Sequence, residues 1–169
     1  LDILWDKQKV VGKPGDEYDV IALYTGELSS CLTVYYVRDG ALIDSDNFVF
    51  TADKITDDSA IVSFLCEMYT GREFVPSQIY VGFESESEHT EIMSEYLSAL
   101  ASYKVYVKVP QKGEYKKLCE LARDNARIHA EQYNAEVQKD NEVLVKLAEL
   151  LALEVVPERI EAVDISNYG

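Results

Sequence analysis

The sequence predicts an α/β fold in which a mixed five-stranded sheet is followed by a long C-terminal helix. Apolar and polar residues alternate in Lys104–Val109, whereas after Gly113 apolar residues recur at three- and four-residue intervals. A change from a period of two to a period near 3.6 marks a strand followed by a helix. A second observation is the Asp39-Gly40 dipeptide between two apolar runs. It is the strongest short hairpin signal in the chain, because Asp-Gly supplies the positive φ of a tight turn.

Three strands are expected before the first helix. Tyr18–Thr25 is mostly apolar and suits a central strand buried on both faces. Cys31–Val37 and Leu42–Phe50 lie on either side of the Asp-Gly turn. The three strands should therefore form an antiparallel meander, which a Gly- and Pro-containing linker over 12–15 precedes.

Two helices and two strands should alternate after the meander. Residues 56–58 offer capping side chains for the first helix, and Gly71 ends it. Gln78–Phe83 is the expected fourth strand and Lys104–Val109 the fifth, with the second helix between them. The residues expected to face inward are Ile61, Phe64, Leu65, Met68 and Tyr69 in the first helix and Ile92, Tyr96, Leu97 and Leu100 in the second.

The third helix is expected from Glu114 toward Gln138. One helical stripe should face the sheet, formed by Leu118, Leu121, Ala122, Ala126 and His129. A single helix that continued to Leu151 would be about 60 Å long at 1.5 Å per residue. We therefore expect a break or kink at residues 139–141, followed by a short amphipathic unit that Pro157 ends.

The resulting order, β-β-β-α-β-α-β-α, is that of the ribonuclease H-like fold, in which the fourth and fifth strands run parallel to the first. Ribonuclease H catalysis needs an aspartate in the middle of the first strand, where this chain has apolar residues 21–23. Asp19 stands at the start of that strand, Glu84 at the end of the fourth and Asp124 on the third helix, while Glu67 falls off the apolar stripe. The sequence thus favours an inactive scaffold, with a stand-alone metal-dependent nuclease as the alternative.

Charge restricts where a nucleic acid could bind. The formal net charge of the chain is −15 and its pI is about 4.4, which argues against nucleic-acid binding over the whole surface. Residues 104–127, however, hold seven cations and three anions, a net charge of +4. Lys108, Lys112 and Lys116 are the candidates for a contact with DNA or with another domain; a solvated helix face is the alternative.

Composition also bounds the cellular setting. The three cysteines form no CxxC pair and lie in apolar patterns, which indicates a reducing compartment without a disulfide framework or zinc site. No apolar run approaches the roughly 20 residues that span a bilayer. We expect a cytoplasmic protein without membrane contact. Because the chain starts at Leu1 and stops at Gly169 within a strand-like pattern, we also expect it to be a piece of a longer polypeptide.

Three stretches carry a resemblance to a known family. VKVPQKGEYKKLCELARDN at Val107–Asn125 resembles the "VPQ-basic-Gly, leucine-rich helix, Asn-Ala" segment of the UvrC family, the C subunit of the bacterial UvrABC excision-repair nuclease. PERIEAVDISNYG at Pro157–Gly169 resembles the "RIE-x-x-DIS-x-x-x-G" motif of that family, and KQKVV at Lys7–Val11 resembles the end of its UvrB-binding helical hairpin. The three matches occur in the family's order and span nearly the whole chain.

The resemblance implies a middle region of a subunit that UvrB recruits and that incises damaged DNA on both sides of a lesion. It implies an end of the UvrB-binding segment with a linker at 1–15, a non-catalytic ribonuclease H-like domain at 16–138, a connecting helix at 139–156, and the first strand of the 5′-incision endonuclease domain at 157–169. Asp164 matches the first carboxylate ligand of a divalent metal, Mg²⁺, in that domain. No cofactor is expected for this chain by itself. A module that contacts only proteins is a further alternative.

Overall fold

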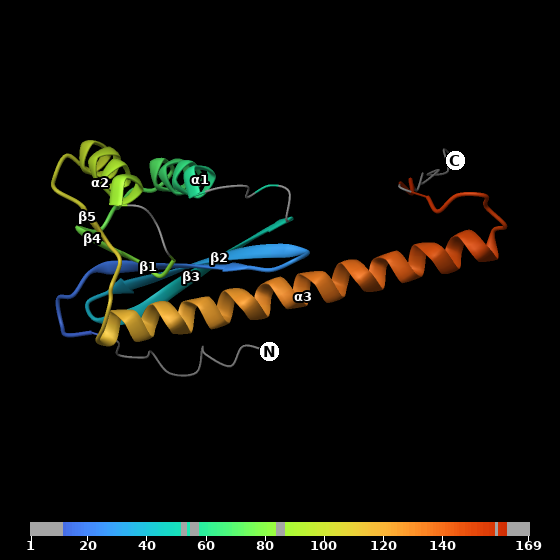
Figure 1. Ribbon diagram of the computed structural model, residues 1–169, viewed down its shortest axis with the longest axis horizontal. Helices are drawn as coiled ribbons and strands as arrows, with labels where there is room; N and C mark the ends of the chain where they lie inside the picture. Colours follow the sequence, from blue (N-terminus) through green and yellow to red (C-terminus); the bar gives the residue numbers. More distant parts are fainter. Residues whose placement is uncertain (1–11, 52–53, 55–57, 84–86, 158, 162–169) are drawn as a thin grey trace, which may run out of the picture. The chain divides into compact units, whose positions relative to one another are not determined.

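The computed structural model describes residues 12–51, 54, 58–83, 87–157 and 159–161 (Figure 1). Five strands and three helices follow one another in the predicted order. They are β1 (Tyr18–Thr25), β2 (Ser29–Arg38), β3 (Ala41–Thr51), α1 (Asp58–Thr70), β4 (Gln78–Val81), α2 (Ser87–Ala101), β5 (Tyr106–Lys108) and α3 (Glu114–Leu150).

The strands form one sheet in the order β3-β2-β1-β4-β5. β1 and β3 pair with β2 in antiparallel fashion, whereas β4 runs parallel to β1 and β5 parallel to β4. The apolar β1 is therefore central, as its composition predicted, and the short β5 is an edge strand. This topology confirms the predicted ribonuclease H-like arrangement of a mixed five-stranded sheet.

The β2–β3 hairpin turns at Asp39 and Gly40, whose φ angles are 51° and 71°. Positive φ at both central residues is the geometry that Asp-Gly favours, so the predicted turn is confirmed. The linker lies against this turn: the Gly40 N–H donates to the Asp16 carbonyl at 2.9 Å, and the Gly12 N–H donates to the Gly40 carbonyl at 3.0 Å. A Cβ at residue 40 would collide with the Lys13 carbonyl. The hairpin and the linker are thus fitted to each other.

The two faces of the sheet carry separate cores. α1 and α2 cover one face, and α3 covers the other (Figure 1). Side chains of a strand alternate between faces, so Ile21 of β1 packs toward α1 and α2, while Val20 and Ala22 pack toward α3. We call these the α1/α2 face and the α3 face.

The inward stripe of α2 differs from the prediction. Leu97 is buried as expected and is joined by Met93, but Ile92, Tyr96 and Leu100 are 48%, 43% and 39% exposed. The reason is Ser98, which the apolar periodicity predicts on the outer side of the helix. Ser98 faces Val105, accepting a hydrogen bond from its N–H at 2.9 Å and donating one to its carbonyl at 3.3 Å. With Ser98 turned toward this backbone, Met93 and Leu97 remain buried, whereas Ile92, Tyr96 and Leu100 lie at the surface.

The expected break at 139–141 is wrong, because α3 is one helix from Glu114 to Leu150. This stretch contains no Pro or Gly, and the polar residues at 139–141 are tolerated on an exposed helix surface. The helix ends in a Schellman motif: Ala152 has a φ of 50°, its N–H donates to the Glu149 carbonyl, and the Leu153 N–H donates to the Ala148 carbonyl. The sheet-facing stripe is buried at Leu118, Ala122 and Ala126, as predicted.

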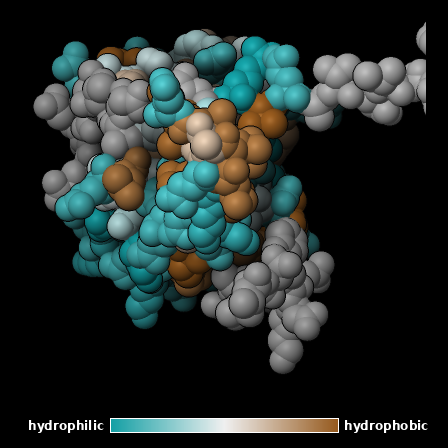
Figure 2. All heavy atoms as spheres, turned by 90° about the vertical axis from the view of Figure 1, so that its right-hand side faces the viewer, coloured by the Kyte–Doolittle hydropathy of each residue, from teal (hydrophilic) through white to brown (hydrophobic). Residues whose placement is uncertain are grey.

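The chain divides into two compact units, Leu1–Tyr133 and Asn134–Gly169. The first holds the sheet, α1, α2 and the part of α3 up to Tyr133. In the second, large apolar side chains are exposed on the end of α3 and after it, and apolar surface is visible where α3 finishes (Figure 2). They include Val143, Leu150, Leu151, Leu153 and Val155. Within the described residues, no helix is long and apolar enough to cross a membrane.

Candidate nucleic-acid interface

The middle of β1, where ribonuclease H catalysis needs an aspartate, is filled with apolar side chains. Ile21 and Ala22 are fully buried, and Leu23 is half-buried. Ile21 belongs to the core under α1 and α2, and Ala22 belongs to the core over α3. A carboxylate at either position would therefore stand in a packed apolar layer rather than in a metal site.

Asp19, at the start of β1, is fully buried on the α1/α2 face. Its Oδ1 accepts a hydrogen bond from the Arg38 guanidinium at 2.7 Å, and its Oδ2 accepts one from the Tyr69 hydroxyl at 2.7 Å. Burial raises the pKa of the Asp19 carboxyl, and the Arg38 charge opposes that rise. Both oxygens of Asp19 are thus engaged inside the fold.

The other carboxylates considered in the sequence do not join Asp19. Asp124 is exposed on α3, on the opposite face of the sheet, and Glu67 is exposed on α1 as predicted. Glu84 and Asp164 lie outside the described residues. In the part of the chain that the structure describes, no group of three His, Cys, Asp or Glu side chains could hold a metal ion. Two-metal catalysis needs several such oxygens around the ions, so the described residues do not fit a two-metal site.

A second polar pair lies beside Asp19. Arg72 pairs with Asp46, which also accepts a hydrogen bond from the Tyr36 hydroxyl at 2.9 Å. The Arg72 guanidinium lies 4.4 Å from the Tyr36 ring centroid. Together with Arg38 these residues line an open hollow of about 660 Å³. Since each arginine already has a carboxylate partner, this network stabilises the fold rather than presenting free cations.

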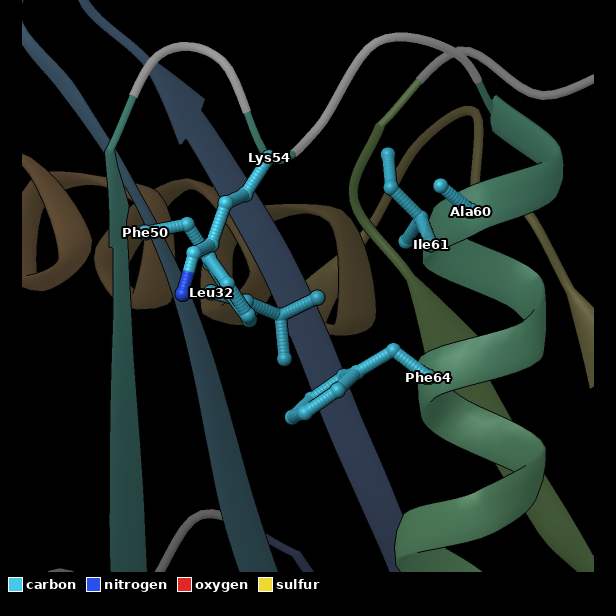
Figure 3. Close-up of a pocket in the computed structure, with 6 residues that line it drawn as sticks. All are labelled: Leu32, Phe50, Lys54, Ala60, Ile61 and Phe64. Atoms are coloured by element: carbon cyan, nitrogen blue, oxygen red, sulfur yellow. The ribbon is translucent and has the colours of Figure 1, made fainter.

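A smaller hollow of about 200 Å³ lies between α1 and the β2–β3 pair. Figure 3 shows Ile61 and Phe64 of α1 pointing toward Leu32 of β2. The Phe64 ring meets Phe50 edge-on at 5.0 Å between centroids. The lining side chains are apolar except for Lys54, and they include no carboxylate, histidine or cysteine.

The predicted basic stretch lies at the free edge of the sheet. Three exposed side chains lie at alternate positions here: Lys104, two residues before β5, and Tyr106 and Lys108 within it. Tyr106 is 49% exposed, and the ammonium groups of Lys108 and Lys104 lie over its ring, 5.3 Å and 5.8 Å from the centroid. We call these three residues the β5 edge. It combines an accessible aromatic ring with a cation on each side of it.

Further tyrosines and lysines adjoin this edge. Tyr80 lies opposite Lys108 in the β4–β5 register. Tyr115, in the first turn of α3, stacks on Tyr80 with centroids 4.0 Å apart and an angle of 15° between the rings. Lys112 is exposed in the loop before α3, whereas Lys116 is half-buried. Two of the predicted contact lysines are therefore at the surface, and the third is partly covered.

The sequence does not indicate the stack of Tyr80 and Tyr115, because α2 and β5 separate the two residues along the chain. The Lys-x-Tyr-x-Lys alternation of Lys104 to Lys108 was the available signal, since it places all three side chains on one side of a strand.

Comparisons with known proteins agree with the fold. Residues 17–133 match the family described as "UvrC Ribonuclease H-like domain". The UvrABC system protein C of Clostridium beijerinckii is 36% identical over 172 residues, covering 99% of this chain and 27% of that protein. That of Acetivibrio thermocellus is 36% identical over 170 residues, covering 97% of this chain and 27% of that protein. The chain thus spans about a quarter of the length of these relatives.

Solved structures give weaker similarities. Ribonuclease H2 from Pyrococcus horikoshii OT3 aligns with a TM-score of 0.37 and 15% identity, over 83% of this chain and 81% of that one. A glucokinase from Parabacteroides distasonis aligns with a TM-score of 0.34 and 15% identity, over 57% of this chain and 32% of that one.

Proposed function

The chain belongs to the UvrC ribonuclease H-like domain family, and from this premise we propose that it is a non-catalytic domain of a UvrC-type excinuclease subunit. In that role it acts in nucleotide excision repair by supporting the adjoining domain that makes the 5′ incision. UvrB and damaged DNA are its partners through the whole protein. The relatives' name, UvrABC system protein C, supports this assignment.

One observation carries the non-catalytic assignment. The centre of β1 is occupied by Ile21 and Ala22, which are fully buried on opposite faces of the sheet. The only carboxylate of β1, Asp19, is held by Arg38 and Tyr69. Without a free carboxylate on the central strand, a ribonuclease H-type arrangement of metal ligands lacks its first member.

The chemistry belongs, in this proposal, to Asp164 and to residues of the whole protein outside this chain. Asp164 stands between apolar residues in the Asp-Ile-Ser sequence, as a carboxylate ligand of Mg²⁺ would on a buried strand. In the whole protein, Asp164→Asn should abolish the 5′ incision and leave the 3′ incision intact. A variant that still made the 5′ incision would contradict the role of Asp164.

The domain limits follow the same scheme. Residues 1–15 end the UvrB-binding segment, 16–138 form the ribonuclease H-like domain, 139–156 connect, and 157–169 begin the endonuclease domain. The exposed lysines at 108 and 112, with Lys116, would contact the DNA backbone or the neighbouring domain.

A cleavage assay tests the proposal directly. We expect the purified 169-residue chain to leave lesion-containing duplex and single-stranded DNA uncut in the presence of Mg²⁺. Any cutting would be compared with the Glu84→Gln variant and, as a matched control, with the exposed Glu67→Gln variant. Magnesium-dependent cutting that Glu84→Gln abolishes and Glu67→Gln preserves would establish an active nuclease instead.

A further inference from the structure

The β5 edge has the composition of a single-strand contact. Tyr106 projects from the last strand of the sheet with about half of its side chain accessible, and a lysine ammonium lies within 6 Å of the ring centroid on each side. Aromatic rings on which bases stack, combined with cations along the backbone path, are how proteins bind single-stranded nucleic acid without sequence preference.

We propose that the β5 edge binds single-stranded nucleic acid, with one base stacked on Tyr106 and the adjacent phosphates held by Lys104 and Lys108. This inference rests on the proposed function for the presence of DNA, and it names the strand and the residues that the domain would contact.

The β5 edge is held in place by buried residues on the other side of the strand. Val105 is fully buried and Val107 packs against the core of the α1/α2 face, so the alternating Lys104, Tyr106 and Lys108 must point away from that core. The Tyr106 N–H also donates to the Ser77 carbonyl at 2.9 Å. The backbone that carries the ring is therefore fixed by the sheet, which lowers the entropic cost of presenting the ring to a ligand.

Charge restricts the nucleic acid to this edge. The chain carries −15 overall, whereas residues 104–127 carry +4, so a polyanion is repelled elsewhere. The Tyr18 ring meets the rings of Tyr80 and Tyr115 edge-on, at 5.5 Å and 5.2 Å between centroids. Its surroundings are acidic: burial, followed by the effects of Tyr115, Asp16 and Glu114, raises the pKa of Tyr18 to about 12. Phosphates are thus expected along the lysines of β5 rather than toward Tyr18.

The exposed ring favours a single strand over a duplex. A base can stack on Tyr106 only when its own face is free, and in a duplex both faces are already stacked on neighbouring base pairs. A purely electrostatic patch would lack this preference, because it would bind the denser charge of duplex DNA at least as well. Strand preference therefore separates stacking from simple charge attraction.

The test is a titration of the 169-residue chain with an end-labelled oligothymidylate about a dozen nucleotides long, read by fluorescence anisotropy at two salt concentrations. Tyr106→Ala should weaken binding roughly 5- to 100-fold at both salt concentrations, the range expected for loss of one stacked base. Tyr106→Phe, which keeps the ring, should bind like the unmodified chain. Tyr133→Ala, which removes an exposed tyrosine of α3, is the matched control and should have no effect.

The lysines are tested by their salt dependence. Lys104→Ala/Lys108→Ala should reduce the slope of log affinity against log salt by about 1.4, since each single-strand phosphate contact contributes about 0.7. Lys139→Ala/Lys146→Ala removes the same charge from exposed positions of α3 and should leave the slope unchanged. Circular dichroism of each variant verifies that it is folded.

Four results would overturn the inference, and the first three concern nucleic-acid binding itself. They are absence of binding at the lower salt concentration, unchanged affinity in folded Tyr106→Ala, and duplex binding as tight as single-strand binding. Competition by polyglutamate as strong as that by unlabelled oligothymidylate would assign the edge to an acidic protein surface and would also overturn it. None of these results bears on the non-catalytic assignment, which the cleavage assay decides separately.

Discussion

The two faces of the sheet use charged and aromatic residues in different ways. On the α1/α2 face, Asp19 is buried between Arg38 and Tyr69, and its charge is satisfied inside the fold. On the α3 face, tyrosines stack beside lysines that remain exposed at the β5 edge. Among the described residues, the buried carboxylate therefore serves stability, whereas the accessible groups at the sheet edge are the ones available for a ligand.

The largest effect is expected from breaking the pair on the α1/α2 face. Asp19→Ala leaves the Arg38 guanidinium without its carboxylate, and removing one partner of a buried ion pair typically costs about 3–5 kcal/mol. We expect about 3 kcal/mol, the lower end, because the Arg38 side chain is still 21% exposed. The free energy of unfolding in urea measures this loss. Glu67→Ala, which removes an exposed carboxylate from α1, is the control, and equal losses in both variants would contradict the buried pair.

Thiol reactivity should distinguish the faces next. Burial raises the pKa of Cys31 and of Cys119, both packed on the α3 face, to about 11 from the ordinary 9.0. The thiolate is the reactive form. At pH 8 a thiol of pKa 11 has a thiolate fraction roughly 100-fold lower than a thiol of pKa 9, and this fraction becomes large only as the pH approaches 11. Burial also raises the pKa of the Cys66 thiol of α1, but this side chain is only half-buried and so remains more accessible than the other two. Alkylation of the native chain, followed by mass spectrometry, should therefore modify Cys66 first.

In urea, where the fold is lost, all three cysteines should react at similar rates. Modification of native Cys119 as fast as in urea would show that the core between α3 and the sheet opens easily.

The smallest effect is expected from the stack beside the β5 edge. Tyr115→Leu keeps an apolar side chain but removes the ring that stacks on Tyr80, and such aromatic pairs contribute about 0.5–1.5 kcal/mol beyond their buried area. A double-mutant cycle with Tyr80→Leu, measured by urea unfolding, isolates this coupling. A coupling energy near zero would mean that the two rings merely lie side by side.

Local patterns in the sequence were sufficient for most of the fold. The Asp39-Gly40 turn and the alternation around Val107 specify their own geometry, because the required φ angles and periods are properties of adjacent residues. The orientation of α2 was not predictable in this way. Ser98 faces inward because it bonds to the Val105 backbone, and such a partner becomes visible only when the helix and the strand are placed together.

For the candidate site, too, local sequence predicted the exposed lysines but not the contacts between distant elements. The exposed lysines at 108 and 112 follow from a local excess of cations, and the structure leaves both at the surface. The pairing of Asp19 with Arg38 depends on the β1–β2 register, in which Asp19 lies opposite Tyr36, two residues from Arg38. The stack of Tyr80 and Tyr115 joins two elements far apart along the chain, so periodicity could not indicate it.

Residue 40, at the β2–β3 turn, should tolerate almost no amino acid other than glycine. Its positive φ alone would admit Asn at some cost, yet a Cβ there would also strike the Lys13 carbonyl of the linker. A surface hairpin turn is ordinarily among the most replaceable parts of a domain. In a library randomised at residue 40, selection for the folded state should therefore return glycine, and other residues should survive only where the segment from Gly12 to Asp16 changes with it.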